Sequence, residues 1–289
     1  MTGRDCPPEA FTDFEIQHSE AIAGAVQPIS PDIALCDDCR RELLDPNDRR
    51  YRYPFINCTN CGPRFTLIQD IPYDRPYTTM SAFDLCDACT EEYQNPLDRR
   101  FHAQPVACPD CGPHVWLETN ETQVDGDAAI RETVRMLKAG AILAIKGLGG
   151  FHLACDATQE ATVATLRQRK QRPDKPFALM MRDMAQIEQY CQVSMDEAKL
   201  LTSPGAPIVL LRRHPHNLSL TITPSVAPRQ LPLGVMLPYT PLHLLSFGDD
   251  IPPLAMPSGN PADHPLVTPS ARARSRRSAF VHGVCLHIA

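Results

Sequence analysis

The sequence has no strong excess of charge of one sign and few aromatic residues. Its 289 residues carry 28 Lys and Arg against 34 Asp and Glu, a formal net charge of −6, and aromatic residues make up 6% of the chain. Proteins that bind nucleic acid are usually basic over the binding domain, and stacking on bases needs aromatic side chains. The composition therefore argues against a general nucleic-acid-binding role, and local clusters of cations must be judged one by one.

The sequence also lacks a long apolar run. No segment approaches the roughly 18 to 20 apolar residues that span a bilayer, and the polar start Thr2-Gly3-Arg4-Asp5 has no apolar region of a secretory signal. We therefore expect a cytoplasmic protein that does not associate with membranes. Disulfides are rare in that reducing compartment, so the 12 cysteines predict metal sites. The length predicts two domains at roughly 150 residues each.

Eight of the cysteines reveal an internal duplication. In each half of the duplication 18 residues separate two CxxC pairs, and the halves repeat with a period of 50 residues. Residues 35–63 and 85–113 are identical at 13 of 29 aligned positions. The four pairs are Cys36 and Cys39, Cys58 and Cys61, Cys86 and Cys89, and Cys108 and Cys111.

This spacing is typical of structural zinc sites. Two CxxC turns supply four thiolates for a tetrahedral ion, and four cysteines leave no open coordination position for catalysis. We therefore predict two structural Zn²⁺ ions, one in each repeat. Pairing of the first turn with the fourth across the duplication, iron–sulfur ligation and metal-free thiols are the alternatives.

The duplicated Asp-Arg-Arg sequence gives each repeat two neighbouring arginines. Four thiolates around Zn²⁺ leave a net charge of −2, which Arg49, Arg50, Arg99 and Arg100 would partly offset if they lay close to the metal sites. Arginines of this kind are more often solvated at the surface, and we favour that interpretation.

The second half of the chain alternates helical and strand patterns. Ile130, Val134 and Leu137 share one helical face, and Gly140 follows as a stop signal. Such alternation is typical of an α/β fold. We expect helices at 128–139, 159–170, 183–190 and 194–201, and strands at 141–145, 151–155, 177–181 and 208–211.

Three local features of the second half carry polar groups suited to phosphate binding. Lys146 precedes a glycine-rich turn, five cations lie between Arg167 and Lys175 at a helix end, and Ser258-Gly259-Asn260 follows the apolar run 253–256. Each has a plain structural interpretation as well: a turn, cations near a helix dipole, and a strand end.

Taken together, these features resemble a known family. Lys170-x-Arg172 and Ser258-x-Asn260, with Pro204-Gly205-Ala206-Pro207-Ile208 between them, resemble the KxR and SxN signature of YrdC-like domains, which bind ATP. The turn Lys146-Gly-Leu-Gly-Gly, preceded by the duplicated CxxC pairs, resembles the HypF family of hydrogenase maturation carbamoyltransferases. The resemblance extends from about Pro28 to Asn260.

The resemblance implies a fold class and a domain order. The fold would be α/β, with a small duplicated zinc-ribbon-like domain at 28–120 and a YrdC-like twisted-sheet domain at 121–289. Residues 1–27 would be the tail of an acylphosphatase-like domain. Members of this family normally also end with a large domain, so we expect this chain to be a fragment that cannot modify its partner alone.

The resemblance also implies an activity. ATP and carbamoyl phosphate, or the carbamate derived from it, would give carbamoyl adenylate, and the carbamoyl group would pass to the C-terminal cysteine of a hydrogenase maturation partner for cyanide ligand synthesis. Lys146, Lys170 and Arg172, with Mg²⁺, would neutralise the phosphates, while Ser258 and Asn260 would donate hydrogen bonds.

Two departures from the family pattern and two other functions qualify this interpretation. Pro257 stands where the family usually has threonine, which predicts a perturbed strand end. The tail 271–289 stops before the basic stretch that usually completes the nucleotide site in this family. The alternatives are a double-stranded RNA-binding module, from the basic cluster at 167–175, and a tRNA threonylcarbamoyl-adenylate synthase. The synthase would leave the two four-cysteine sites without a role.

Overall fold

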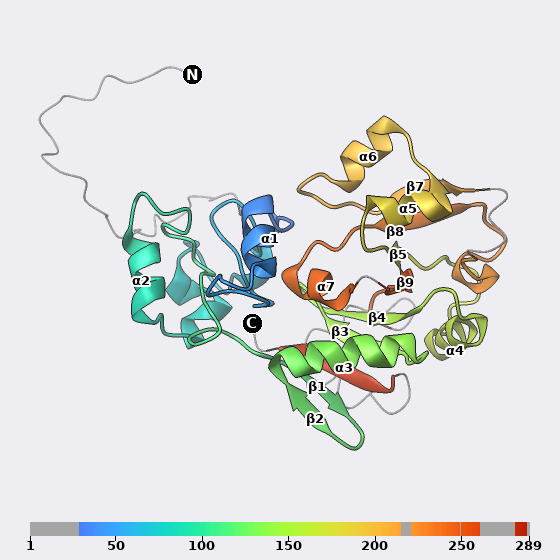
Figure 1. Cartoon of the computed structure of the whole chain (residues 1–289), viewed down its shortest axis with the longest axis horizontal. Coiled ribbons are helices and arrows are strands. Elements are labelled where there is room, and N and C mark those ends of the chain that lie inside the picture. The colour runs from blue at the N-terminus through green and yellow to red at the C-terminus, as the bar shows by residue number, and fades with distance from the viewer. Residues whose placement is uncertain (1–28, 215–220, 249, 261–280, 288–289) are drawn as a thin grey trace, which may run out of the picture.

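The computed structural model describes residues 29–214, 221–248, 250–260 and 281–287 (Figure 1). The tail 1–27 and residues 271–277 lie outside the described residues. None of the helices within the described ranges has the length and the apolarity that a bilayer crossing requires.

The first part of the described chain contains two short helices related by the 50-residue period. Helix α1 (Asp37–Leu44) and helix α2 (Asp87–Gln94) each begin directly after the first cysteine of a repeat. Acidic residues in the first turn of each helix interact favourably with the positive end of the helix dipole and stabilise the helix. Three 3-10 turns lie between the helices: η1 (Phe65–Leu67), η2 (Arg75–Tyr77) and η3 (Thr79–Ala82).

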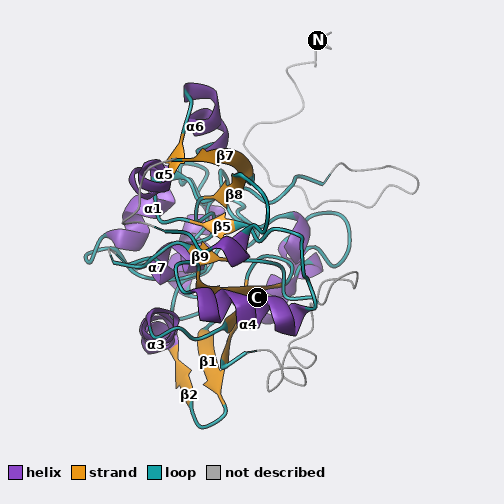
Figure 2. Cartoon of the chain, turned by 90° about the vertical axis from the view of Figure 1, so that its right-hand side faces the viewer, coloured by secondary structure: helices purple, strands orange, loops and turns teal. Residues whose placement is uncertain are grey.

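The rest of the chain builds a mixed sheet with strand order β2-β1-β10-β3-β4-β9-β5-β8-β7-β6. Figure 2 shows the strands stacked from β2 at the bottom to β7 near the top. Only β10 with β3 and β5 with β8 pair in parallel among the described strands. The strands are β1 (Val115–Thr119), β2 (Gln123–Asp125), β3 (Leu143–Lys146), β4 (Phe151–Asp156), β5 (Leu179–Met180), β6 (Cys191–Gln192), β7 (Val209–Arg213), β8 (Pro232–Met236), β9 (Leu254–Ala255) and β10 (Gly283–His287).

Five α-helices and a 3-10 turn accompany the sheet in the described residues: α3 (Gly126–Lys138), α4 (Glu160–Lys170), α5 (Met184–Tyr190), α6 (Met195–Leu201), η4 (Pro224–Val226) and α7 (Pro241–Ser246). Their starts follow capping rules. The side chain of Asp183 accepts a hydrogen bond at the start of α5, Ser194 and Glu197 form a capping box at α6, and Thr240 with Pro241 opens α7.

The α/β fold class expected from the sequence is confirmed, and each element expected between 128 and 211 is present to within two residues. The sequence pattern gave no sign of β10, which inserts between β1 and β3. It also placed the second domain at 121–289, whereas β1 already pairs with the sheet inside the range assigned to the first domain.

Two apolar clusters pack on the sheet. Successive side chains of β3 point to alternate faces of the sheet and so belong to different clusters. Ala144 belongs to the cluster that contains Leu166 of α4, whereas Leu143 and Ile145 belong to the cluster that contains Leu137 of α3. The second cluster continues through α7 into the cysteine repeats, where it includes Leu43, Ile56 and Leu67. The repeats therefore share a core with one face of the sheet.

Hydrogen bonds reinforce this contact. The backbone N–H of Ala34 donates to the carbonyl of Pro204 at 2.9 Å, and that of Leu35 donates to the carbonyl of Tyr239 at 3.1 Å. Arg52 Nε donates to the Asp127 carboxylate at the start of α3 at 2.6 Å. The repeats are thus fixed against the sheet at points far apart in the sequence.

Candidate functional site

The structure brings the eight paired cysteines together in two clusters, one in each repeat. Within each cluster the four sulfurs lie within 4.8 Å of one another. The first contains Cys36, Cys39, Cys58 and Cys61, and the second contains Cys86, Cys89, Cys108 and Cys111. The grouping follows the within-repeat pairing expected from the sequence.

The spacing of the sulfurs fits a zinc ion. Zinc–sulfur bonds of about 2.3 Å in a tetrahedron place neighbouring sulfurs about 3.8 Å apart. Cys58 Sγ lies 3.7 Å from Cys36 Sγ and 3.8 Å from Cys61 Sγ, and Cys108 Sγ lies 3.7 Å from both Cys86 Sγ and Cys111 Sγ. The clusters therefore support structural zinc, and their four-cysteine shells leave no position for a substrate.

Local backbone geometry positions the sulfurs. Cys36 and Cys86 lie in extended conformation directly before α1 and α2, so that the next cysteine of each pair falls in the first helical turn. In the second CxxC turn of the first repeat, the N–H of Cys61 donates to the carbonyl of Cys58 at 3.4 Å, and Gly62 follows with a φ of +97°. A side chain is strained at that φ, which explains the glycine.

The favoured interpretation of the four Asp-Arg-Arg arginines as solvated surface residues was wrong. Two of them are buried, and the partly exposed Arg49 and Arg99 contact cysteine sulfurs. Arg50 is 1% exposed and Arg100 is 4% exposed. Arg50 forms an ion pair with Glu92, and Arg100 forms one with Glu42. The duplication places the arginines of one repeat against a carboxylate of the other, and this pairing compensates the burial of their charge.

Lys170 is the centre of the candidate nucleotide site. It is the last residue of α4 and is only 2% exposed. Its ammonium donates to the backbone carbonyl of Ser258 at 2.6 Å and to that of Asn260. The structure thus brings together three of the five predicted nucleotide-binding residues. Burial, with a smaller effect of the neighbouring Arg172, lowers the pKa of Lys170 to about 8.

The loop that carries Ser258 and Asn260 is fixed to the start of β4. The N–H of Gly259 donates to the carbonyl of Phe151 at 2.6 Å, and Ser258 forms an isolated bridge with His152. The carbonyl of Pro257 accepts a hydrogen bond from the N–H of Leu153 at 2.8 Å. Pro257 is thus held beside β4 through its carbonyl, and β9 ends two residues before it, at Ala255.

Lys146 lies at the other side of Phe151. It ends β3, where it pairs with Phe151, and its ammonium donates to the carbonyl of His287 at 2.9 Å. Burial lowers its pKa. Phe151 pairs with Lys146 and also accepts the hydrogen bond from Gly259, so the end of β3 lies beside the 258–260 loop.

Arg172 and Arg167 organise the loop after α4. Arg172 donates to the carbonyl of Pro176 at 2.9 Å, and Arg167 donates to the carbonyls of Ser225 at 2.6 Å and Arg172 at 2.5 Å. Both guanidinium groups lie over the ring of Phe177, Arg167 at 4.3 Å and Arg172 at 5.5 Å from its centroid. Arg167 is therefore a structural residue of this loop.

Sequence reasoning missed a cavity of about 450 Å³ between the cysteine repeats and the glycine-rich turn. The turn contributes Lys146 and residues 147–150, and the repeats contribute Phe55, Phe65 and Thr66. No pattern in the sequence indicates these contacts, because they join segments about 80 residues apart whose approach depends on the shared core.

Two histidines and a tyrosine lie close to the same turn; His243 is buried, and His152 and Tyr239 are half-buried. His152 Nε2 and Tyr239 Oη are 3.1 Å apart, and the ring of His243 packs against both. Burial, with a smaller effect of His152, lowers the pKa of His243 to about 3, and burial lowers that of His152. These rings are therefore neutral near pH 7 and add no positive charge for a phosphate.

Gly259→Ala is expected to displace the 258–260 loop without unfolding the chain. A Cβ at this position would lie 2.7 Å from Phe151 Cβ and 2.8 Å from the Phe151 carbonyl oxygen, so the backbone must move. The site loop and Lys170 would separate, and ATP affinity should fall about tenfold or more, the scale of one lost charge-assisted hydrogen bond. Calorimetry with ATP measures this. Gly248→Ala, where the added Cβ meets only an Asp250 carboxylate oxygen at 4.0 Å, is the matched control.

Comparison with known families matches both parts of the chain. A family model described as "HypF finger" matches residues 35–68 and 85–118. The Sua5/YciO/YrdC family model, described as "Telomere recombination", matches residues 135–286. The first match covers both cysteine repeats and most of β1, and the second runs from within α3 to β10.

Similar proteins cover nearly the whole chain. A Carbamoyltransferase HypF of Synechocystis is 48% identical over 283 residues, which is 97% of this chain and 36% of that protein. A Carbamoyltransferase HypF of Rhodobacter capsulatus is 51% identical over 95% of this chain and 36% of its own length. The crystal structure of full-length HypF in the phosphate- and nucleotide-bound form superimposes with a TM-score of 0.86 at 48% identity, over 92% of this chain and 34% of that one. The chain thus spans about 36% of the length of these curated relatives.

Proposed function

Because the chain belongs to the HypF family, with two HypF fingers ahead of a Sua5/YciO/YrdC domain, we propose that it binds ATP and carbamate and forms carbamoyl adenylate. The observation that carries the proposal is the meeting of Lys170 with the loop of Ser258 and Asn260. A buried ammonium held at a polar loop is suited to binding phosphate oxygens.

The proposed reaction is a nucleotidyl transfer. A carbamate oxygen attacks the α-phosphorus of ATP, the bond from that phosphorus to the bridging oxygen breaks, and pyrophosphate leaves. Lys146, Lys170 and Arg172 would offset the charge of the triphosphate together with Mg²⁺, and Ser258 and Asn260 would donate hydrogen bonds to it. Fixed cations and donors of this kind lower the barrier because they need no reorganisation during the reaction.

The carbamoyl group is then proposed to pass to the C-terminal cysteine of a hydrogenase maturation partner. The partner's thiolate attacks the carbamoyl carbon, and AMP leaves. The two zinc ions take no part in this chemistry. In this proposal they hold the repeats that form one wall of the 450 Å³ cavity beside Lys146.

The test of the first step supplies ATP, Mg²⁺ and ammonium carbamate to the purified chain and measures pyrophosphate. We expect carbamate-dependent release of pyrophosphate that is lost in Lys170→Ala and kept in Lys199→Ala, a change of an exposed lysine on α6. Release that requires added threonine would instead indicate a threonylcarbamoyl-adenylate synthase. ATP binding without any carbamate-dependent release would refute adenylate formation by this chain.

The ATP affinity should depend on pH through Lys170. Its pKa of about 8 means that the side chain is cationic below pH 8 and loses its charge as the pH rises above that value. The attraction for the triphosphate is therefore fully present at pH 6 to 7 and should fall about tenfold by pH 9, since one pH unit beyond a pKa removes nine tenths of the charged form. Calorimetric titrations from pH 6 to 9 measure the trend. Lys170→Arg keeps its charge over this range and should show a flat profile, and an equally steep profile in that variant would contradict the assignment.

A further inference from the structure

The arginines of each cysteine repeat contact the metal-binding sulfurs of the other repeat. Arg99 Nη1, from the second repeat, donates to Cys39 Sγ of the first at 3.0 Å. Arg49 Nη2, from the first repeat, donates to Cys89 Sγ of the second at 3.1 Å and lies 3.6 Å from Cys86 Sγ. The four sulfurs of a cluster thus come from one repeat, whereas the cation beside them comes from the other.

The backbone beside each cluster is held in the same reciprocal way. Arg50 Nε donates to the carbonyl of Ala107 at 2.8 Å, and Arg100 Nε donates to the carbonyl of Asn57 at 3.2 Å. Residues 57 and 107 are equivalent under the 50-residue period, and each directly precedes the second CxxC turn of its repeat. Each repeat therefore fixes the entry to the other's metal-binding turn.

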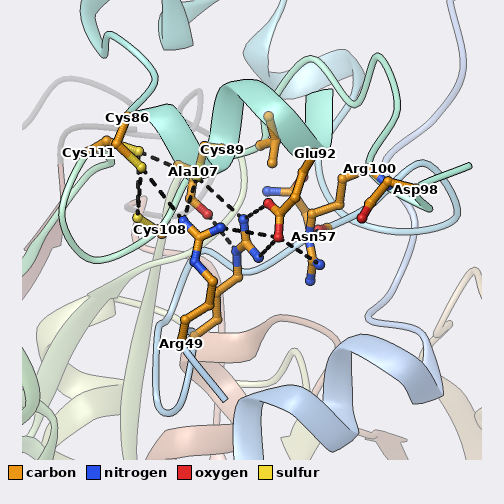
Figure 3. A network of polar contacts seen from close by, with 12 residues as sticks. Arg49, Asn57, Cys86, Cys89, Glu92, Asp98, Arg100, Ala107, Cys108 and Cys111 are labelled. Carbon is orange, nitrogen blue, oxygen red and sulfur yellow. Dashed lines mark hydrogen bonds and ion pairs between the residues drawn. The ribbon is translucent and has the colours of Figure 1, made fainter. Parts of the chain in front are cut away.

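Two equivalent carboxylates, one in each repeat, form ion pairs with arginines of the other repeat. The Glu92 carboxylate on α2 lies 3.1 Å from Arg49 Nη1 and 2.5 Å from Arg50 Nη2, both of the first repeat. Glu42 on α1 forms ion pairs with Arg99 and Arg100 of the second repeat. Figure 3 shows Glu92 next to the second cysteine cluster, with Arg49 of the first repeat beside it and Arg100 of its own repeat at 3.8 Å.

We propose that these reciprocal contacts couple the two metal centres, so that zinc loading of one repeat raises the zinc affinity of the other. Four thiolates on one Zn²⁺ carry a net charge of −2, and the nearby guanidinium stabilises that charge. The guanidinium keeps its position only while its own repeat is folded, and a four-cysteine repeat folds on its metal. Loss of zinc from one repeat therefore removes a cation and a backbone support from the other.

The test is a chelator titration of the full chain followed by native mass spectrometry, which counts chains with two, one and no zinc. We expect the two-zinc form to pass directly to the zinc-free form. Contacts that orient metal ligands typically change metal affinity about 10- to 100-fold. A one-zinc form that rises to the level expected for independent sites would overturn the coupling, and this result needs no variant.

Single-residue variants test which contacts carry the coupling between the two metal centres. In Cys89→Ser, which alters only a ligand of the second cluster, the first cluster should lose zinc at a chelator concentration at least about tenfold lower than in the unaltered chain. Arg99→Met should have the same effect on the first cluster. Arg41→Met is the control, because Arg41 lies in the first repeat but pairs with Asp38 of the same repeat. The proposal would be refuted if the first cluster kept its zinc as firmly in both Cys89→Ser and Arg99→Met as in the unaltered chain.

This inference rests on the zinc centres proposed above and not on the nucleotide site. The starting point of the titration separates the two possible failures. A chain that carries no zinc contradicts the metal assignment, whereas a chain that carries two ions and loses them independently contradicts only the coupling.

Discussion

Cys58→Ser is expected to remove zinc from the first repeat and to unfold the cysteine region while the sheet domain stays folded. Zinc binding energy is folding energy in small domains of this kind, about 10 kcal/mol or more for a structural site at pH 7. Cys58 is fully buried, so a serine there also leaves a hydroxyl in a site built for a thiolate. The sheet retains its own apolar cluster around Leu166 and Phe177, which contains no residue of the repeats.

Elemental analysis of zinc and limited proteolysis measure this outcome. Proteases should cut within residues 29–114 and spare the sheet domain. Cys191→Ser is the matched control, since Cys191 is a buried cysteine of β6 outside both clusters. A Cys58→Ser chain that keeps two zinc ions and resists proteolysis would contradict the assignment of Cys58 as a ligand.

The second large effect is expected for Lys170→Ala, which should weaken ATP binding by roughly 1.5 to 3 kcal/mol, the range for hydrogen bonds to charged groups. The substitution removes a cation from the proposed phosphate site and also frees the loop at Ser258 and Asn260, whose carbonyls accept from the ammonium. Isothermal titration calorimetry measures the affinity, with Lys199→Ala as the exposed control on α6.

Arg172→Ala gives a comparison within the same signature. Its guanidinium donates to the carbonyl of Pro176 and lies over the ring of Phe177. Removing it should therefore lower ATP affinity both by changing the conformation of the loop and by removing a positive charge. We expect a smaller loss than for Lys170→Ala. Unchanged affinity in both variants would place the nucleotide elsewhere in the chain.

The cysteine clusters could be predicted from spacing alone, because the two CxxC turns of a repeat are close in sequence and their geometry is local. The roles of Arg49 and Arg99 could not. A 50-residue period shows that the repeats are equivalent, but it does not show how they face each other. Whether an arginine points to solvent, to its own cluster or to the other one depends on that arrangement.

The candidate nucleotide site follows from the resemblance, because the residues alone carry only weak signals. Helix 159–170 had a clear pattern, yet nothing in it indicated that Lys170 would meet residues about 90 positions later. The glycine between Ser258 and Asn260 is explained only by the close approach of Phe151. Strand β10 was missed for a similar reason, because its partner β3 lies about 140 residues earlier and its own apolar run is short.

The position of β10 has a consequence for synthesis of the protein. Strands β1 and β3 are made early, but they are joined by a strand that ends at His287. A growing chain on the ribosome therefore holds two unpaired strand edges for the time needed to add about 140 residues, and such edges attract other strands. The cysteine repeats are finished before that interval begins. Zinc supply during translation and chaperone capture of the incomplete sheet should therefore act at separate stages of the nascent chain's growth.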